Sequence, residues 1–139
     1  MVRARWVAVA AVVLVLGLAV RAWGDGRFAQ HSGTALYASM IYVGLFVLWP
    51  STPPVRAGLV AVGFCWVVEF FQLTGIPEAL SARSLPARLV LGRQFDGVDL
   101  AWYPVGVVPL VVLHLLVKRR AVGPAATVGP GSRAGRPRG

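Results

Sequence analysis

Apolar residues along this chain form four long runs, and charged or turn-forming residues separate each run from the next. The runs cover approximately residues 6–22, 34–49, 55–72 and 98–117. A helix that crosses a bilayer core of about 30 Å needs roughly 20 apolar residues, and shorter spans are tolerated when flanking side chains reach the interface. The pattern therefore predicts an all-α membrane protein with four transmembrane helices.

Prolines mark the connection between the second and third runs. Pro50, Pro53 and Pro54 cannot continue a helix, because each ring removes a backbone donor and restricts the residue before it. The connection is short, so we expect the two flanking helices to form an antiparallel hairpin.

Two segments outside the spans have signatures of their own. Ser84 is a candidate N-cap and Gly92 a candidate helix end, which predicts a short interfacial helix over residues 85–91, between spans three and four. Residues 121–139 are rich in Gly, Pro and Arg and are predicted to form a disordered basic tail after a membrane domain over residues 1–120.

The first run has a second interpretation. Arg3 and Arg5 precede 15 uncharged, largely apolar residues, and Val20 and Ala22 have the small or medium size that is found before a signal-peptide cleavage site. Cleavage there would leave three spans. A membrane span and a cleaved secretory signal are both compatible with the sequence.

The composition supports a membrane location. The chain is 57% hydrophobic and only 14% charged, whereas a soluble domain has roughly 45–50% apolar and about 25% charged residues. A globule of 139 residues cannot hide this much apolar surface from water. The composition therefore excludes an ordinary soluble enzyme, and the lipid bilayer is the expected partner.

The net charge of +9 is distributed unevenly. Nine Lys and Arg residues fall on the termini and the proline-rich hairpin, and five fall on the other two loops. Positive residues are retained on the cytoplasmic side, so we expect a multi-pass protein of the plasma membrane with both termini in the cytoplasm. No aromatic residues alternate with the basic ones in the tail, which argues against nucleic acid as a partner. The acidic residues all lie on or beside the opposite side: Asp25, Glu69, Glu78, Asp96 and Asp99.

A candidate polar site lies at the non-cytoplasmic ends of spans three and four. Glu69 and Gln72 share one face at the end of span three, and Asp99 and Tyr103 share a face at the start of span four. An ionisable residue in an apolar helix needs a partner. For Glu69, an alternative without a function is that its carboxylate extends to the membrane interface. Asp96 is better explained as a helix cap.

The loops on that side add two candidates. Arg83 lies in a loop that the positive-inside rule disfavours, so we expect it to pair with Glu69 or Asp99. Asp25 lies between two glycines, which predicts a turn at the membrane face. Gly106 would allow another helix to approach span four closely.

Other chemistry finds little support. Cys65 is a single thiol within a span and is expected to be a packing residue. His31 and His114 are predicted on opposite sides of the membrane, so no shared metal site is expected. No phosphate loop or nucleophile elbow is present, no cofactor is implied, and the carboxylates do not single out a catalytic residue.

The combination of Glu69-Phe70-Phe71-Gln72, Arg83 and the segment from Leu91 to Tyr103 resembles the DUF2809 family of small bacterial membrane proteins, over about residues 20–118. That family is similar to the VanZ-like proteins, which implies a link to the cell envelope and to glycopeptide resistance. The chain departs from the VanZ-like pattern at Tyr103, where an Asn is expected. The resemblance implies one site that faces away from the cytoplasm, formed by Asp25, Glu69, Gln72, Arg83, Asp99 and Tyr103.

Three functions are compatible with these residues. The first is binding of an anionic or polar component of the cell envelope, such as a lipid headgroup or a cell-wall precursor. The second is a structural network of ion pairs in a protein that associates with a membrane partner or with copies of itself. The third, enzymatic action on a lipid-linked substrate, is favoured least.

Overall fold

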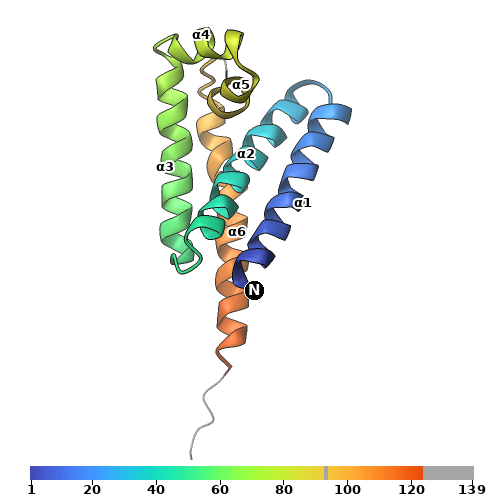
Figure 1. Cartoon of the computed structure of the whole chain (residues 1–139), viewed down its shortest axis with the longest axis vertical. Coiled ribbons are helices and arrows are strands. Elements are labelled where there is room, and N and C mark those ends of the chain that lie inside the picture. The colour runs from blue at the N-terminus through green and yellow to red at the C-terminus, as the bar shows by residue number, and fades with distance from the viewer. Residues whose placement is uncertain (93, 124–139) are drawn as a thin grey trace, which may run out of the picture.

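The computed structural model describes residues 1–92 and 94–123, which form an up-and-down bundle of four long helices with two short helices across one end (Figure 1). The predicted tail lies mostly outside the described residues. The helices are α1 (Val2–Trp23), α2 (Gly26–Leu48), α3 (Pro54–Gln72), α4 (Ile76–Arg83), α5 (Leu85–Leu91) and α6 (Asp99–Ala121).

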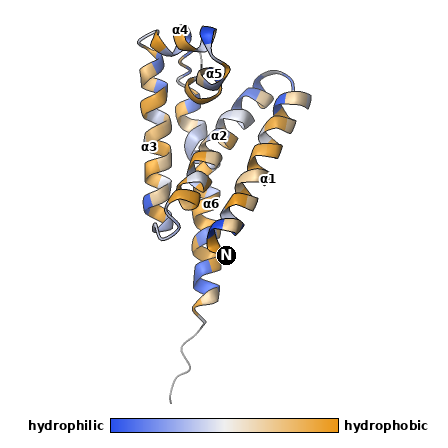
Figure 2. Ribbon diagram, viewed as in Figure 1, coloured by the Kyte–Doolittle hydropathy of each residue, from blue (hydrophilic) through white to orange (hydrophobic). Residues whose placement is uncertain are grey.

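The four long helices α1, α2, α3 and α6 are each long and apolar enough to cross a membrane. Hydrophobic residues dominate their middle turns and hydrophilic residues gather at their ends (Figure 2). Large apolar side chains such as Val15, Leu59 and Val67 are exposed, as expected where lipid is the solvent. The predicted class, an all-α membrane protein with four spans, is confirmed.

The α2 helix begins earlier than the apolar run predicts. It starts at Gly26, whereas the second run was placed from residue 34. Its first turns contain Arg27, Gln30 and His31, which lower the local hydropathy without interrupting the backbone hydrogen bonds. An apolar run therefore underestimates a helix whose end carries polar residues, and these residues prove to be part of the site.

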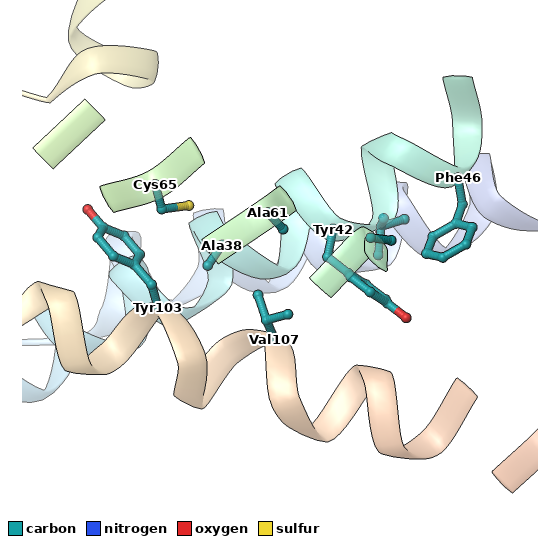
Figure 3. Close-up of a cluster of buried hydrophobic side chains, with 9 residues drawn as sticks. Ala38, Tyr42, Phe46, Ala61, Cys65, Tyr103 and Val107 are labelled. Carbon is teal, nitrogen blue, oxygen red and sulfur yellow. The ribbon is translucent and has the colours of Figure 1, made fainter. Parts of the chain in front are cut away.

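Small residues let α2, α3 and α6 pack closely around the core (Figure 3). Ala38, Ala57 and Ala61 are fully buried at these contacts. A Cβ atom on Gly106 would overlap the backbone carbonyl of Ala35, so the predicted close approach at Gly106 is confirmed. In membranes such contacts gain van der Waals packing where no hydrophobic force drives helices together.

Aromatic side chains join the N-terminal half of α1 to the rest of the bundle. The Trp6 ring stacks on Phe46 with 4.4 Å between ring centroids, and it also lies 5.1 Å from the ring of His114. The hydroxyl of Tyr42 is 3.1 Å from Nδ1 of His114. None of the α1 residues is fully buried within the chain, so α1 packs on the outside of the bundle.

The segment between α3 and α6 contains the predicted short helix and one more. The α5 helix has the expected bounds, the Ser84 side chain accepts a hydrogen bond from the Ala87 N–H, and Gly92 follows at a φ of 69°. The preceding helix, α4, was not predicted. Its signal was Pro77 in a first turn after Gly75, a residue that takes a left-handed conformation.

Three side chains from three helices hold the C-terminal end of α5. Helix ends leave carbonyl groups without intrahelical partners, which is costly beside lipid. Each of these side chains donates to one of the last carbonyl oxygens. The bonds run from Tyr37 to Val90 (2.8 Å), from Gln72 to Leu91 (2.6 Å) and from Ser81 to Gly92 (2.6 Å). The α4–α5 segment is thus fastened to the bundle through polar contacts.

Candidate functional site

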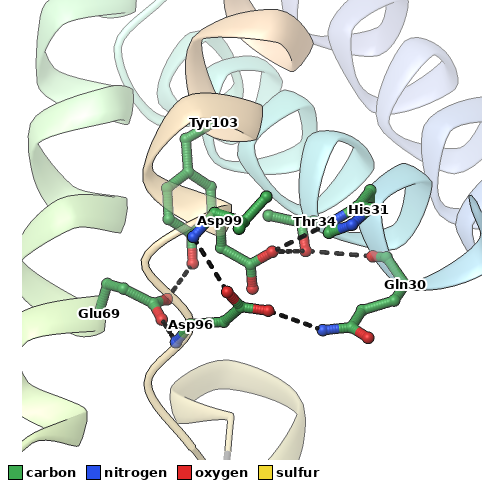
Figure 4. A network of polar contacts seen from close by, with 8 residues as sticks. Gln30, His31, Thr34, Glu69, Asp96, Asp99 and Tyr103 are labelled. Carbon is green, nitrogen blue, oxygen red and sulfur yellow. Dashed lines mark hydrogen bonds and ion pairs between the residues drawn. The ribbon is translucent and has the colours of Figure 1, made fainter. Parts of the chain in front are cut away.

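A network of polar side chains lies where the start of α2, the end of α3 and the start of α6 meet (Figure 4). These ends are brought together by the up-and-down topology, since α2 and α6 begin at the end of the bundle where α3 finishes (Figure 1). The network is confined to that end, and the N-terminus of the chain lies at the other.

Glu69 is the buried centre of the network, with 1% of its surface exposed. Its Oε2 accepts a hydrogen bond of 2.5 Å from the Tyr103 hydroxyl, and its Oε1 accepts one of 2.7 Å from the backbone N–H of Asp96. Hydrogen bonds to a charged group are each worth about 1.5–3 kcal/mol. Glu69 therefore ties the end of α3 to the start of α6, and it does not merely reach the interface.

Asp99 continues the network towards α2. Its Oδ1 accepts a hydrogen bond of 3.1 Å from the Thr34 hydroxyl and lies 3.7 Å from Nδ1 of His31. The second distance fits an ion pair but is too long for a hydrogen bond. The His31 ring stacks on Trp102 at 5.2 Å, with an angle of 6° between the planes. Two residues of α2 thus face one carboxylate of α6.

Asp96 connects the network to its outer edge. Its Oδ1 accepts a hydrogen bond of 3.0 Å from the Val98 N–H, and its Oδ2 accepts one of 3.1 Å from Nε2 of Gln30. The first contact is a local turn that leads into α6, in line with the predicted capping role. The second shows that Asp96 also has a partner on a distant helix.

Gln72 lies beside this network rather than in it. Its Nε2 donates to the carbonyl of Leu91, and its buried Oε1 has no hydrogen-bond partner among the described residues. A Cβ atom on Gly92 would lie 2.7 Å from Nε2 of Gln72, so glycine is needed there both for its positive φ and for this contact.

Besides Gln72, two more of the six predicted residues lie apart from the network. Arg83 is exposed at the end of α4 and forms an ion pair with neither Glu69 nor Asp99. Asp25 is exposed in the connection between α1 and α2, and its side chain makes no cap hydrogen bond there. Glu69, Asp99 and Tyr103 are brought together, with the carboxylates held by hydroxyl and N–H donors where an arginine was expected.

Three residues of the network were missed in the sequence. Gln30, His31 and Thr34 lie in the first turns of α2, at or just before the start of the apolar run. The sequence feature that could have indicated them is the spacing of Gln30 and Thr34. Two polar residues four positions apart lie on the same face of a helix, here at the end of an apolar one. Which helix this face of α2 contacts depends on how α2 packs on α6.

The network contains more acidic than basic side chains. It contains the three carboxyl groups of Glu69, Asp96 and Asp99, and within the described residues the basic side chain that contacts it is His31. No group of three or more His, Cys, Asp or Glu residues in residues 1–92 and 94–123 has the arrangement of a metal site. The hydrogen-bond donors to the three carboxyl groups are hydroxyl, side-chain amide and backbone N–H groups.

The same segment of the chain carries a family signature. A family model described as a protein of unknown function, DUF2809, matches residues 23–107. The chain belongs to the DUF2809 family. The match covers α2 to α5 and the first part of α6, and all the residues of the network lie within it. It leaves α1 and the basic end of α6 outside. No solved structure matches this DUF2809 protein.

Proposed function

We propose that this DUF2809 protein binds, through the polar network, a cationic or hydrogen-bond-donating group of a cell-envelope component. The observation that supports this most is the gradient of exposure along the network. The side chains of His31 and Asp99 are 18% and 15% exposed, whereas Glu69 is buried. The inner part is therefore closed and paired, and the outer part is open to a ligand.

The preference for a cation follows from the partners. Asp96 and Asp99 accept hydrogen bonds from uncharged donors only, apart from the long contact to His31. A carboxylate gains more from a charged donor than from a neutral one. An anionic ligand, which the sequence left open, would need Arg83, and Arg83 lies outside the network.

The envelope as the source of the ligand rests on two expectations. From the distribution of Lys and Arg over the loops we expect both termini in the cytoplasm and the network on the opposite face of a bacterial plasma membrane. The resemblance to VanZ-like proteins implies an envelope role, including one in glycopeptide resistance. An ammonium headgroup, as in phosphatidylethanolamine, has the required chemistry.

The test is a titration of the full chain in detergent with phosphatidylethanolamine, followed by native mass spectrometry. We expect the double variant Asp96→Asn, Asp99→Asn to weaken binding about tenfold, because two charged acceptors become neutral. Glu78→Gln, which removes an exposed carboxylate from α4, is the control and should change nothing. Equal binding by the double variant and the control would contradict the proposal.

A cellular experiment tests the envelope role. Deletion of the gene should change susceptibility to antibiotics that act on the envelope, glycopeptides included. The variant Asp96→Asn, Asp99→Asn should fail to restore wild-type susceptibility in the deletion strain. Unchanged susceptibility to all of them would remove the support for a role in the envelope.

A second function, a structural network in a protein that associates with a membrane partner, is favoured by one observation. Both carboxylate oxygens of Glu69 already have donors within the chain. If this is the whole role, the variants at Asp96 and Asp99 should lower the melting temperature in detergent and leave lipid binding by the folded protein unchanged.

A further inference from the structure

An open basic groove lies at the end of the bundle opposite the polar network. The cavity has a volume of about 460 Å³ and is formed by the start of α1, the connection between α2 and α3, and the start of α3. It is lined by Arg3, Leu48, Trp49, Pro50, Ser51, Thr52, Pro53 and Arg56. Hydrophilic residues mark both helix starts at this end in Figure 2.

The two arginines of this basic groove lie in unfavourable positions within their own helices. Arg3 is in the first turn of α1 and Arg56 in the first turn of α3, and neither first turn contains an acidic residue. The N-terminus of a helix carries partial positive charge, so an anion is favoured there and a cation is disfavoured. Arg119, in the last turn of α6, has the favourable placement. A bound anion would reverse the penalty in the groove.

The groove also lacks a negative partner within the protein. Neither Arg3 nor Arg56 forms an ion pair with another described residue. All five acidic residues of the chain belong to the α1–α2 connection, the end of α3, α4 or the segment that begins α6. Two arginines from distant parts of the chain thus line one cavity and have no ion-pair partner among the described residues.

The other lining groups suit a phosphate. Arginine presents paired N–H donors that match phosphate oxygens, and the hydroxyl groups of Ser51 and Thr52 line the same cavity. The first turn of α3 has no side-chain cap, so the backbone N–H groups of Val55 and Arg56 lack a capping acceptor. These donors add to a site whose charge comes from the arginines.

The surroundings of the groove point to a lipid as the source of the phosphate. Leu48, Trp49 and Val55 are each at least 53% exposed, and Leu59 continues the exposed apolar surface along α3. A polar groove that runs into lipid-facing side chains matches the two parts of a phospholipid. We propose that the basic groove binds the phosphate of an anionic phospholipid, with its acyl chains along α2 and α3. This site is independent of the polar network and of its ligand.

The experiment titrates the full chain in detergent with phosphatidylglycerol and follows bound lipid by native mass spectrometry. The variant Arg3→Gln, Arg56→Gln should bind it about 10- to 30-fold more weakly, as expected for two lost arginine contacts. The matched control is Arg119→Gln, Arg120→Gln, which removes the same charge from the same end of the bundle. Equal losses in the two variants would overturn the proposal, because they would indicate general attraction to charge.

A second variant distinguishes a loss of binding contacts from misfolding or an altered topology. Arg3→Lys, Arg56→Lys keeps both charges and loses the paired donors, so we expect binding about threefold weaker or more than in the wild type. Wild-type binding by this variant would overturn the assignment of the phosphate to the guanidinium groups.

Two further arms identify the ligand. Phosphatidylcholine, which has no net charge, should bind more weakly than phosphatidylglycerol. Inorganic phosphate at constant ionic strength should not displace bound phosphatidylglycerol, and displacement would show that the groove takes free phosphate rather than lipid. Phosphatidylethanolamine binding should be unchanged in Arg3→Gln, Arg56→Gln, which separates this site from the polar network.

Discussion

The two ends of this bundle differ in whether their ionisable side chains have partners within the protein. At the end where α3 finishes, the carboxylates of Glu69, Asp96 and Asp99 accept hydrogen bonds from side chains and backbone groups of other segments. At the end with the N-terminus, Arg3 and Arg56 line an open groove and have no acidic partner among the described residues. The carboxylates at one end join helices through hydrogen bonds, whereas the two arginines at the other end make no ion pair with a described residue.

The physical reason for the difference is burial. A buried carboxylate without donors is costly, so Glu69 requires the partners that the fold supplies. An exposed guanidinium stays hydrated and requires no partner. Substitutions in the network should therefore change stability most, and substitutions in the basic groove should change binding and leave stability nearly unaltered.

Glu69→Ala should have the largest effect. It leaves the Tyr103 hydroxyl and the Asp96 N–H without their acceptor, and we expect the free energy of unfolding to fall by about 2–5 kcal/mol, because each unsatisfied donor costs about 1–3 kcal/mol. Unfolding of the reconstituted protein by sodium dodecyl sulfate would measure it. Glu78→Ala, at an exposed position of α4, is the control, and a similar loss there would contradict the special role of Glu69.

Gly106→Ala should come next. The added methyl group would overlap the carbonyl of Ala35 and push α2 from α6, at a cost of about 1–3 kcal/mol. The same unfolding assay applies. Gly63→Ala, where a Cβ atom meets nothing within 4 Å, is the matched control and should not destabilise the protein. If both substitutions were harmless, the close approach of α2 and α6 would not support the network.

Thr34→Val should have a smaller effect, because Asp99 is more exposed than Glu69. The substitution removes the hydroxyl that donates to Asp99 and should lower the free energy of unfolding by about 1 kcal/mol. Thr34→Ser retains the hydroxyl and should retain most of the stability. A loss as large as that of Glu69→Ala would erase the proposed distinction between the inner and outer parts of the network.

Arg56→Gln should have the smallest effect on stability. It removes a positive charge from the positive end of α3, so the free energy of unfolding without added lipid should stay within about 0.5 kcal/mol of the wild type, towards higher stability. A clear destabilisation in the same assay would show that the basic groove serves the fold.

The family match includes all of the polar network but only part of the basic groove. Residues 23–107 include every residue of the polar network and also Arg56, but they do not include Arg3. The polar network therefore uses only residues of the family segment, whereas the basic groove also uses the start of α1, which lies outside it.

Much of the architecture was accessible from the sequence. Apolar runs placed one long helix at each of the four predicted spans, and Ser84 and Gly92 marked the bounds of α5. The site was accessible only in part. Glu69, Asp99 and Tyr103 were found because ionisable or polar groups in apolar helices require partners, whereas the contacts of Gln30, His31 and Thr34 depend on which face of α2 meets α6.

The expected pairing of Arg83 shows why sequence alone could not complete the site. Opposite charges near each other in the sequence suggested an ion pair, but Arg83 ends α4 with its side chain exposed, and Tyr103 and a backbone N–H occupy the oxygens of Glu69. Hydropathy and helix-end signals are local, so the chain by itself determined the class, the spans and the short helix. Partners on different helices are decided by packing, so only the tertiary structure decided what holds each carboxylate and which arginines share a groove.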